Sequence, residues 1–397
     1  MRVSTNMIYS SGLASIQSGS ASLLRTQQQV ASGRKILSPS DDPVGSVRTL
    51  EVTQSKELNA QFQYGQGVAK DTLSLVESRL SAVTDNLTYI RERVVAAGNS
   101  VLSQDDRKAI AKDLRARFDE LVGLANSQNG EGEFLFAGLQ GDTQPFSGNV
   151  DSGVSYHGDD GTRSVRVSPS RYLAVTNSGS ELFMRARSGN GTFTTSAATS
   201  NTGSGIIDSG TVTDPTLITG HSYQISFALS GSTLTYQVVD QSTSATVSTG
   251  NYTDGAEIAF DGMSLSIKGT PSATDTFDVA PSTEQSVFAT VSDLISTLET
   301  GGSTQVGNAI GTALTNLDNA TESVLRVHAS VGSRLTEIES LESVSEDLDA
   351  QYAQVLSSLN DLDYAEALTR LSQQQTVLEA AQKSFMQISR LSLFNYL

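Results

Sequence analysis

Few side chains in this sequence are of types that do chemistry, and their spacing indicates structural roles. The chain has three histidines and no cysteine, which excludes disulfides, thiolate metal ligands and cysteine nucleophiles. His157 stands close to Asp159 and Asp160, a combination that could ligate a metal ion. Because Gly158 and Gly161 bracket the two acids as in a solvated turn, we expect no metal site there.

The remaining candidates for acid–base or nucleophilic chemistry also have simpler interpretations. Asp41 and Asp42 are adjacent carboxylates, but no histidine lies near them, and Asp42 directly precedes Pro43. This order is typical of a helix N-cap followed by the first helical position, where the missing N–H of proline costs nothing. His221 and His328 lack a recognisable serine–aspartate constellation, and no nucleotide-binding glycine motif occurs. The sequence predicts no cofactor and no enzyme activity.

The composition favours an elongated body with much surface and argues against several partners. Among 397 residues, 37% are hydrophobic and 6% aromatic, and the formal net charge of −17 argues against free nucleic acid as a partner. The basic residues of 1–40 are too dispersed for a membrane anchor, and no apolar run approaches the roughly 18 residues that span a bilayer. The N-terminus lacks the pattern of a Sec signal peptide, so we expect no membrane anchoring and no export by that route.

Proline positions divide the chain into two helical arms and a different middle. Residues 44–144 and 282–397 are free of proline, whereas 138–281 is rich in Ser, Thr, Gly and Asn, with short β-branched and aromatic runs. This order indicates that the two arms pair and that the middle is an insertion. We therefore expect an α+β fold, a long antiparallel α-helical coiled-coil bundle formed by both chain ends with an inserted β-rich outer domain.

The first arm has the clearest helical periodicity. We expect a helix over 43–97 and a second over about 105–127, while the other arm repeats the design over 287–362 with a break at 301–302. Apolar residues at steps of three and four mark a coiled-coil seam. The expected bundle core is Leu73, Val76, Leu80, Val83, Leu87, Ile90 and Val94.

Both chain ends have weaker amphipathic stripes. Helices of about 25 residues with polar seam positions, here Ser20 and Gln27, are marginal in water, and ordering each residue costs about 1–2 kcal/mol. We infer that the ends order on assembly, against one another and against neighbouring subunits. The alternative, docking on the bundle of an isolated chain, stays open. The expected subunit-interface residues are Leu13, Ile16, Leu23, Val30, Leu371, Leu378, Phe385, Ile388, Leu391, Phe394 and Leu397.

Three stretches resemble the bacterial flagellin superfamily. They are QQQVASGRKILSPSDDPVGS at 27–46, GEFLFAGLQGDTQPF at 132–146 with YHGDDG at 156–161, and DYAEALTRLSQQQTVLEAAQKSFMQISRLSLFNYL at 363–397. The ending LSLFNYL is similar to that of hook–filament junction proteins and differs from the tails of filament flagellins. In the middle, FDGMSLSIKGTPSATDTFDVAPS at 260–282 resembles a small β-unit of flagellar outer domains.

The resemblance implies a division into polymerisation segments at 1–42 and 363–397, rod parts at 43–147 and 283–362, and an outer domain at 148–282. It also implies export in unfolded form through the flagellar type III apparatus, with an export chaperone, to an extracellular site at the hook–filament junction. There a ring of copies would contact hook-associated protein 1 and flagellin. A divergent filament-forming flagellin, or an enzyme carried in the inserted domain, are the alternatives.

Overall fold

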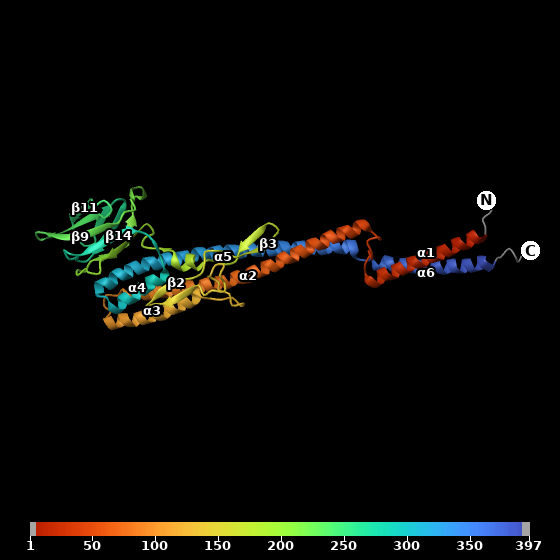
Figure 1. Cartoon of the computed structure of the whole chain (residues 1–397), viewed down its shortest axis with the longest axis horizontal. Coiled ribbons are helices and arrows are strands. Elements are labelled where there is room, and N and C mark those ends of the chain that lie inside the picture. The colour runs from red at the N-terminus through yellow and green to blue at the C-terminus, as the bar shows by residue number, and fades with distance from the viewer. Residues whose placement is uncertain (1–4, 391–397) are drawn as a thin grey trace, which may run out of the picture. The chain divides into compact units, whose positions relative to one another are not determined.

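The computed structural model describes the backbone of residues 5–390 and the side chains of residue 7 and residues 9–387. The chain divides into two compact units. We call Met1–Tyr64 with Ser340–Leu397 the terminal unit, and Gly65–Glu339 the central unit. The α-helices are α1 (Thr5–Ser32), α2 (Pro43–Ala97), α3 (Gln104–Ala125), α4 (Val287–Thr300), α5 (Ser303–Asn360) and α6 (Tyr364–Arg390) (Figure 1). Helices α2 and α5 contribute residues to both units.

The helix ends follow local rules that the sequence displays. Helix α2 begins at Pro43, and the Oδ1 atom of Asp42 accepts the N–H of Gly45 at 2.9 Å. Helix α3 begins with a capping box in which Ser103 and Asp106 bond to each other's backbone N–H. The expected helix over 43–97 is therefore present, and the one expected over 105–127 spans Gln104–Ala125.

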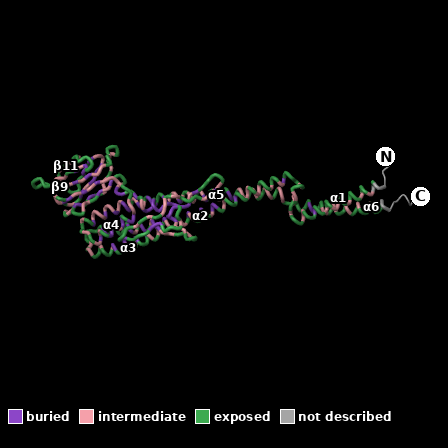
Figure 2. Tube along the Cα trace, in the orientation of Figure 1, coloured by how far each residue is buried: buried purple, intermediate pink, exposed green. Residues whose placement is uncertain are grey.

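The central unit contains a helical bundle with a continuous apolar core. Parts of α2 and α5 run antiparallel, since Arg91 pairs with Asp318 at 2.6 Å and Glu77 with His328 at 3.5 Å. Helices α3 and α4 contact each other, and α3 joins α2 through the Nδ2 atom of Asn86, which donates to the carbonyl of Arg117 at 3.3 Å. The core residues named from the periodicity of α2 are all buried, with exposed fractions of at most 1%. Figure 2 shows this burial along α2, and the α+β fold class is confirmed.

Phenylalanine rings close one part of this bundle. Phe118 of α3, Phe288 of α4 and three rings from the connecting segments, Phe136, Phe146 and Phe183, have centroids 5.3–5.9 Å apart in contacting pairs. All five are buried. The connecting segments also form paired short strands, β1 (Phe146–Asn149) with β2 (Gly153–Tyr156), β3 (Ser164–Ser168) with β4 (Arg171–Ala174), and β5 (Ala186–Arg187) with β15 (Glu284–Gln285).

The β-rich region has two sheets that share one hydrophobic core. The five-stranded sheet has the order β11-β10-β9-β14-β6, and the second has the order β12-β13-β7, with β8 pairing β13. Their shared core runs from Phe193 to Val279, so the expected outer domain at 148–282 also includes strands outside this core. The strands are β6 (Phe193–Ala197), β7 (Ile206–Ile207), β8 (Thr211–Val212), β9 (Tyr223–Ser230), β10 (Thr233–Asp240), β11 (Thr246–Asn251), β12 (Glu257–Phe260), β13 (Met263–Lys268) and β14 (Thr276–Pro281).

Amide side chains of α5 bond this β-rich region to the bundle. The Oδ1 atom of Asn308 accepts the N–H of Ile207 at 3.0 Å, and that of Asn316 accepts the N–H of Gly189 at 2.9 Å. The Nδ2 atom of Asn319 donates to the carbonyl of Gly189 at 2.7 Å. In each bond the partner of the asparagine is a backbone group, so the bonds position this part of the chain whatever side chains it carries.

Candidate assembly surface

The two terminal helices lie side by side in one antiparallel pair (Figure 1). Phe385 of α6 lies edge-to-face against Tyr9 of α1, with ring centroids 5.7 Å apart. A Cβ atom at Gly12 would lie 2.7 Å from Phe385, and one at Gly19 would lie 3.4 Å from Leu378. Glycines seven residues apart on α1 therefore face large side chains seven residues apart on α6. The α6 side chains act as knobs, and the glycines leave room for them, as in knobs-into-holes packing of a coiled coil.

The same register continues to the end of α1. Gly33 has a φ of +69°, the left-handed conformation that commonly ends a helix, and a Cβ there would lie 2.9 Å from the hydroxyl of Tyr364. Its carbonyl accepts the N–H of Leu362 at 3.0 Å, and the N–H of Lys35 donates to the carbonyl of Asn360 at 2.7 Å. The start of α6 is thus fixed to the end of α1.

The loop between α1 and α2 is held by Asp41, which lies within the first stretch resembling flagellins. Its carboxylate accepts the N–H groups of Leu37 and Ser38, each at 3.1 Å, and pairs with Arg25. Burial opposes ionisation, but these bonds outweigh it and lower the pKa of the Asp41 carboxyl. Both adjacent aspartates therefore stabilise local structure: Asp41 accepts N–H groups of the loop, and Asp42 accepts an N–H group at the start of α2.

The part of α2 and α5 within the terminal unit pairs through polar groups. The Nδ2 atom of Asn59 donates to the carbonyl of Ser345 at 2.7 Å, and both residues are buried. Lys56 lies 3.7 Å from Asp349, an exposed pair that contributes little. A buried asparagine in a helical seam fixes the register at a cost in stability.

Apolar side chains of the terminal unit are poorly covered. Among its described residues, Ala367 is the one apolar residue that is fully buried, whereas the central unit has an extensive buried core. Leu13, by contrast, is 50% exposed and Val44 is 79% exposed. Figure 2 shows few buried positions along α1 and α6. The large exposed apolar side chains of the unit are those of Met7, Leu13, Leu24, Leu37, Val44, Val47, Leu50, Leu58, Tyr64, Val344, Tyr364, Leu368, Val377 and Met386.

The expected interface residues fall into three groups. Ile16, Leu23, Val30, Leu371, Leu378 and Phe385 are half-buried, with Leu378 and Phe385 facing α1 of the same chain. Leu13 is exposed. The side chain of Ile388 and residues Leu391, Phe394 and Leu397 lie outside the described residues. Their role between subunits stays a prediction.

The small residues of α1 that face α6 were not predicted from the sequence. Ser20 and Gln27 were expected in the seam of α1, but the positions in contact with α6 include Gly12 and Gly19, and Thr26 is buried. The available signal was a heptad of small residues at 12, 19, 26 and 33 opposite large residues spaced by seven on α6. A search for apolar stripes does not detect this signal, because glycine counts as neither an apolar nor a polar residue.

The residues considered as metal ligands in the sequence, His157, Asp159 and Asp160, form hydrogen bonds or ion pairs with nearby groups of the protein. The Oδ1 atom of Asp159 accepts the N–H groups of Leu139 and Gly161, at 2.9 and 2.7 Å, and Asp160 pairs with Arg185 at 2.7 Å. The Nε2 atom of His157 lies 2.7 Å from the hydroxyl of Ser147 on the exposed face of a hairpin. Within the described part of the chain, no three metal-ligating side chains gather, and no helix has the length and apolarity needed to cross a bilayer.

Comparisons with known proteins agree with the arrangement of the helices. A model of the bacterial flagellin N-terminal helical region matches residues 3–141. Flagellar hook-associated protein 3 of Escherichia coli strain K12 is 26% identical over 394 residues, which cover 99% of each chain. The crystal structure of FlgL from Xanthomonas campestris is 32% identical with a TM-score of 0.72, and the match covers 77% of this chain and 99% of that one. This chain belongs to the hook-associated protein 3 (FlgL) family.

Two further matches extend the comparison to a third species and to the β-rich region. The structure of the flagellar junction protein FlgL from Legionella pneumophila is 30% identical, with a TM-score of 0.73 over 79% of this chain and all of that one. Residues 196–281 match a model of the D2-like domain of flagellar hook-associated protein 1. The range agrees with the shared core of the two sheets. As a member of the FlgL family, the chain is a structural component of the flagellum, and its relatives are structural proteins.

Proposed function

We propose that this protein is the adaptor that joins the flagellar hook to the flagellin filament. A ring of copies would meet hook-associated protein 1 on one side and flagellin on the other, and torque would pass through helix–helix contacts without any bond being made or broken. The observation that carries this proposal is the poorly covered apolar surface of the terminal unit. A surface of this kind on a structural flagellar protein indicates contacts with neighbouring subunits.

The energetics of the terminal unit support ordering on assembly. Each ordered residue costs about 1–2 kcal/mol of conformational entropy, and burial of apolar surface returns about 25 cal/mol per Å². With Ala367 as the fully buried apolar residue among those described, the unit recovers little of this cost within one chain. Neighbouring subunits would cover the exposed apolar side chains of α1, α2 and α6 and complete the stabilisation.

The surroundings of the protein follow from the same role. As a part of the hook–filament region it would be extracellular, exported through the flagellar type III apparatus with the help of a chaperone. The resemblance of residues 196–281 to a domain of hook-associated protein 1 supports a shared outer architecture at this part of the flagellum. The inserted domain would project outward and would carry no enzyme activity.

Deletion of the gene tests the junction role. We expect cells without the protein to produce flagellin and to release it into the medium as monomer, with hooks that carry no filament. If the protein were instead a filament-forming flagellin, deletion would remove this chain from the filament and no other flagellin would leak. Filaments of normal length in the deletion strain would overturn the proposal.

A pair of substitutions tests the contribution of α6. Leu378→Asp together with Phe385→Asp should abolish assembly, because a charge at a half-buried apolar seam loses hydration without gaining a partner. Both residues lie in the terminal unit, so the melting of the central unit should remain unchanged. Gln382→Asp places the same charge on an exposed position of α6 and is the matched control. Equal destabilisation of the central unit would contradict the proposal.

Hydrogen exchange tests whether ordering depends on assembly. On a dilute, monomeric sample we expect weak protection of the amides of residues 13–30, and strong protection once the protein is incorporated into hook–filament structures. The amides of α2 around Leu80 provide an internal reference, since that part of the helix lies in a complete core. Strong protection of residues 13–30 in the monomer would show that α1 and α6 are stable without neighbours.

A further inference from the structure

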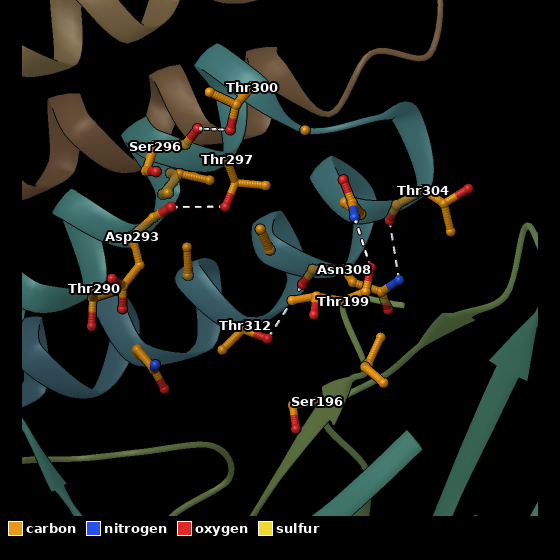
Figure 3. Close-up of a pocket in the computed structure, with 18 of the residues that line it drawn as sticks. Ser196, Thr199, Thr290, Asp293, Ser296, Thr297, Thr300, Thr304, Asn308 and Thr312 are labelled. Carbon is orange, nitrogen blue, oxygen red and sulfur yellow. Dashed lines mark hydrogen bonds between the residues drawn. The ribbon is translucent and has the colours of Figure 1, made fainter. Parts of the chain in front are cut away.

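A cavity of about 560 Å³ lies in the central unit where β6 approaches α4 and the first turns of α5. Figure 3 shows its polar lining, with Thr290, Asp293 and Thr297 from α4, and Thr304 and Thr312 from α5. Its apolar lining includes Ala197, Leu294, Ala309 and Ala313. The cavity has the size of a small-molecule site.

Asp293 is the one charged side chain among the described residues that line this cavity. No basic side chain of the described residues lines the cavity. Asp293 is itself exposed, so its carboxylate is accessible to a ligand, and a lining with one negative and no positive charge favours a cation over an anion.

Three threonine hydroxyls of the lining already donate their hydrogens within the protein. Thr297 donates to the carbonyl of Asp293 at 2.8 Å, Thr300 to that of Ser296 at 2.9 Å, and Thr312 to that of Asn308 at 3.2 Å, each one helical turn earlier (Figure 3). A hydroxyl has one hydrogen to donate and two lone pairs to accept. These threonines therefore offer acceptors to the cavity.

Three side-chain amides of the lining also donate to other groups of the protein. The Nε2 atom of Gln305 donates to the carbonyl of Thr199 at 3.1 Å, the Nδ2 atom of Asn308 to that of Gly205 at 3.0 Å, and the Nδ2 atom of Asn316 to Gln285 at 3.0 Å. The cavity consequently presents threonine oxygens as acceptors, a single negative charge and no positive charge. This pattern suits a ligand that is positively charged and rich in N–H groups.

We propose that this cavity binds a protonated primary amine on a methylene chain. The ammonium group would lie at Asp293 and donate to the carboxylate and to threonine oxygens, and the methylene groups would lie against Leu294, Ala309 and Ala313. The amine can come from a free diamine or from a lysine side chain of another molecule, since both present the same group. This proposal is independent of the junction role.

Calorimetric titration of the full-length protein tests the proposal with three probes. Cadaverine represents a free diamine, Nα-acetyl-lysine methylamide represents a lysine side chain, and 1,5-pentanediol is the neutral analogue of cadaverine. We expect saturable binding of at least one amine and none of the diol. Stronger binding of the lysine derivative indicates a protein-borne amine, and stronger binding of cadaverine indicates a free one. No saturable binding of either amine, or equal binding of the diol, would overturn the proposal.

Two variants locate the site, and a third controls for loss of charge. Asp293→Asn keeps the shape of the side chain and should weaken amine binding by about tenfold or more, the loss expected for a charged hydrogen bond. Ala309→Leu fills the cavity and should abolish binding while Asp293 is retained. Asp119→Asn removes an exposed charge on α3 outside the lining and should leave binding unchanged. Unaltered binding by either cavity variant would refute the proposed site.

Discussion

The ring of Phe385 occupies the place that a side chain at residue 12 would need, since a Cβ atom on Gly12 would lie 2.7 Å from the Cδ2 atom of the ring. Atoms at that separation overlap, so one of the two residues would have to move. Gly19, one heptad further along α1, has more room because its Cβ would lie 3.4 Å from Leu378. Of these two glycines, Gly12 therefore constrains the register of the terminal pair more strongly.

Alanine at these two glycines should have opposite effects. Gly12→Ala creates overpacking that costs about 1–3 kcal/mol, more than the roughly 1 kcal/mol that alanine adds to an α-helix relative to glycine. Gly19→Ala gains the same helix propensity with an ordinary contact and should stabilise the pair. Hydrogen exchange of the α1 amides, measured in assembled protein, reports both changes.

A compensating change shows whether Phe385 is the cause. In the Gly12→Ala background, Phe385→Leu removes the ring that clashes and should restore part of the protection of α1. If Gly12→Ala weakened the pair equally with either residue at 385, the effect would come from elsewhere on α1, and the proposed register would be incorrect.

The core of the central unit should be intolerant of charge. Leu80 is fully buried in the seam of α2, and Leu80→Asp places an unpaired charge there, at a cost of about 3–5 kcal/mol. Val95→Asp puts the same residue at a position of α2 that is 52% exposed and should cost little. Denaturant unfolding followed by circular dichroism measures both. A Leu80→Asp protein as stable as the parent would contradict the assignment of the seam.

Strong periodicity made the long helices predictable. In α2 the apolar steps of three and four, the Asp42–Pro43 start and the proline-free length all agree, so the expected bounds match those observed. In the terminal helices the apolar pattern does not predict the packing. The contacts of α1 with α6 involve glycines, which a search for apolar stripes does not detect. The seam assigned there differs by one position, from Leu13 to Gly12.

The links between the β-rich region and the bundle were beyond prediction for a different reason. They join residues more than 100 positions apart in the sequence, as in the bonds from Asn308 to Ile207 and from Asn316 to Gly189. An asparagine on a helix is usually exposed, and no local pattern distinguishes one that bonds to a distant backbone group. The cavity that lies beside these links was unpredictable for the same reason.

Removal of the amide at Asn316 should loosen the attachment of the β-rich region. Its side chain is 3% exposed and bonds to both Gly189 and Gln285. Asn316→Ala leaves buried polar groups without partners, which costs about 1–3 kcal/mol. Asn319→Ala, at a half-buried position, should cost less. Faster hydrogen exchange and proteolysis at residues 187–192 are the expected signs, and unchanged rates in Asn316→Ala would contradict the role of this amide.

A buried carboxylate gives the β-rich region a specific response to acid. The Oδ2 atom of Asp240 lies 2.7 Å from the Nδ1 atom of His221, and its Oδ1 atom accepts the N–H groups of Ser242 and Thr243 at 2.7 and 3.2 Å. Burial by itself would raise the pKa of this carboxyl. The hydrogen bonds from His221, Ser242 and Thr243 outweigh burial and lower the pKa to about 2.

This lowered pKa sets the pH range in which the turn after β10 should lose stability. An unfolded aspartate titrates at 3.8, so between that value and about 2 the folded state binds fewer protons than the unfolded state, and stability rises with pH. The contribution is complete above about pH 4 and is lost as the pH falls toward 2. We expect the hydrogen-exchange protection of residues 240–245, corrected for intrinsic rates, to decline across this range. In Asp240→Asn the protection should be lower above pH 4 and should lack this decline, whereas Asp119→Asn should behave as the parent protein. An identical decline in Asp240→Asn would assign the acid response to another group.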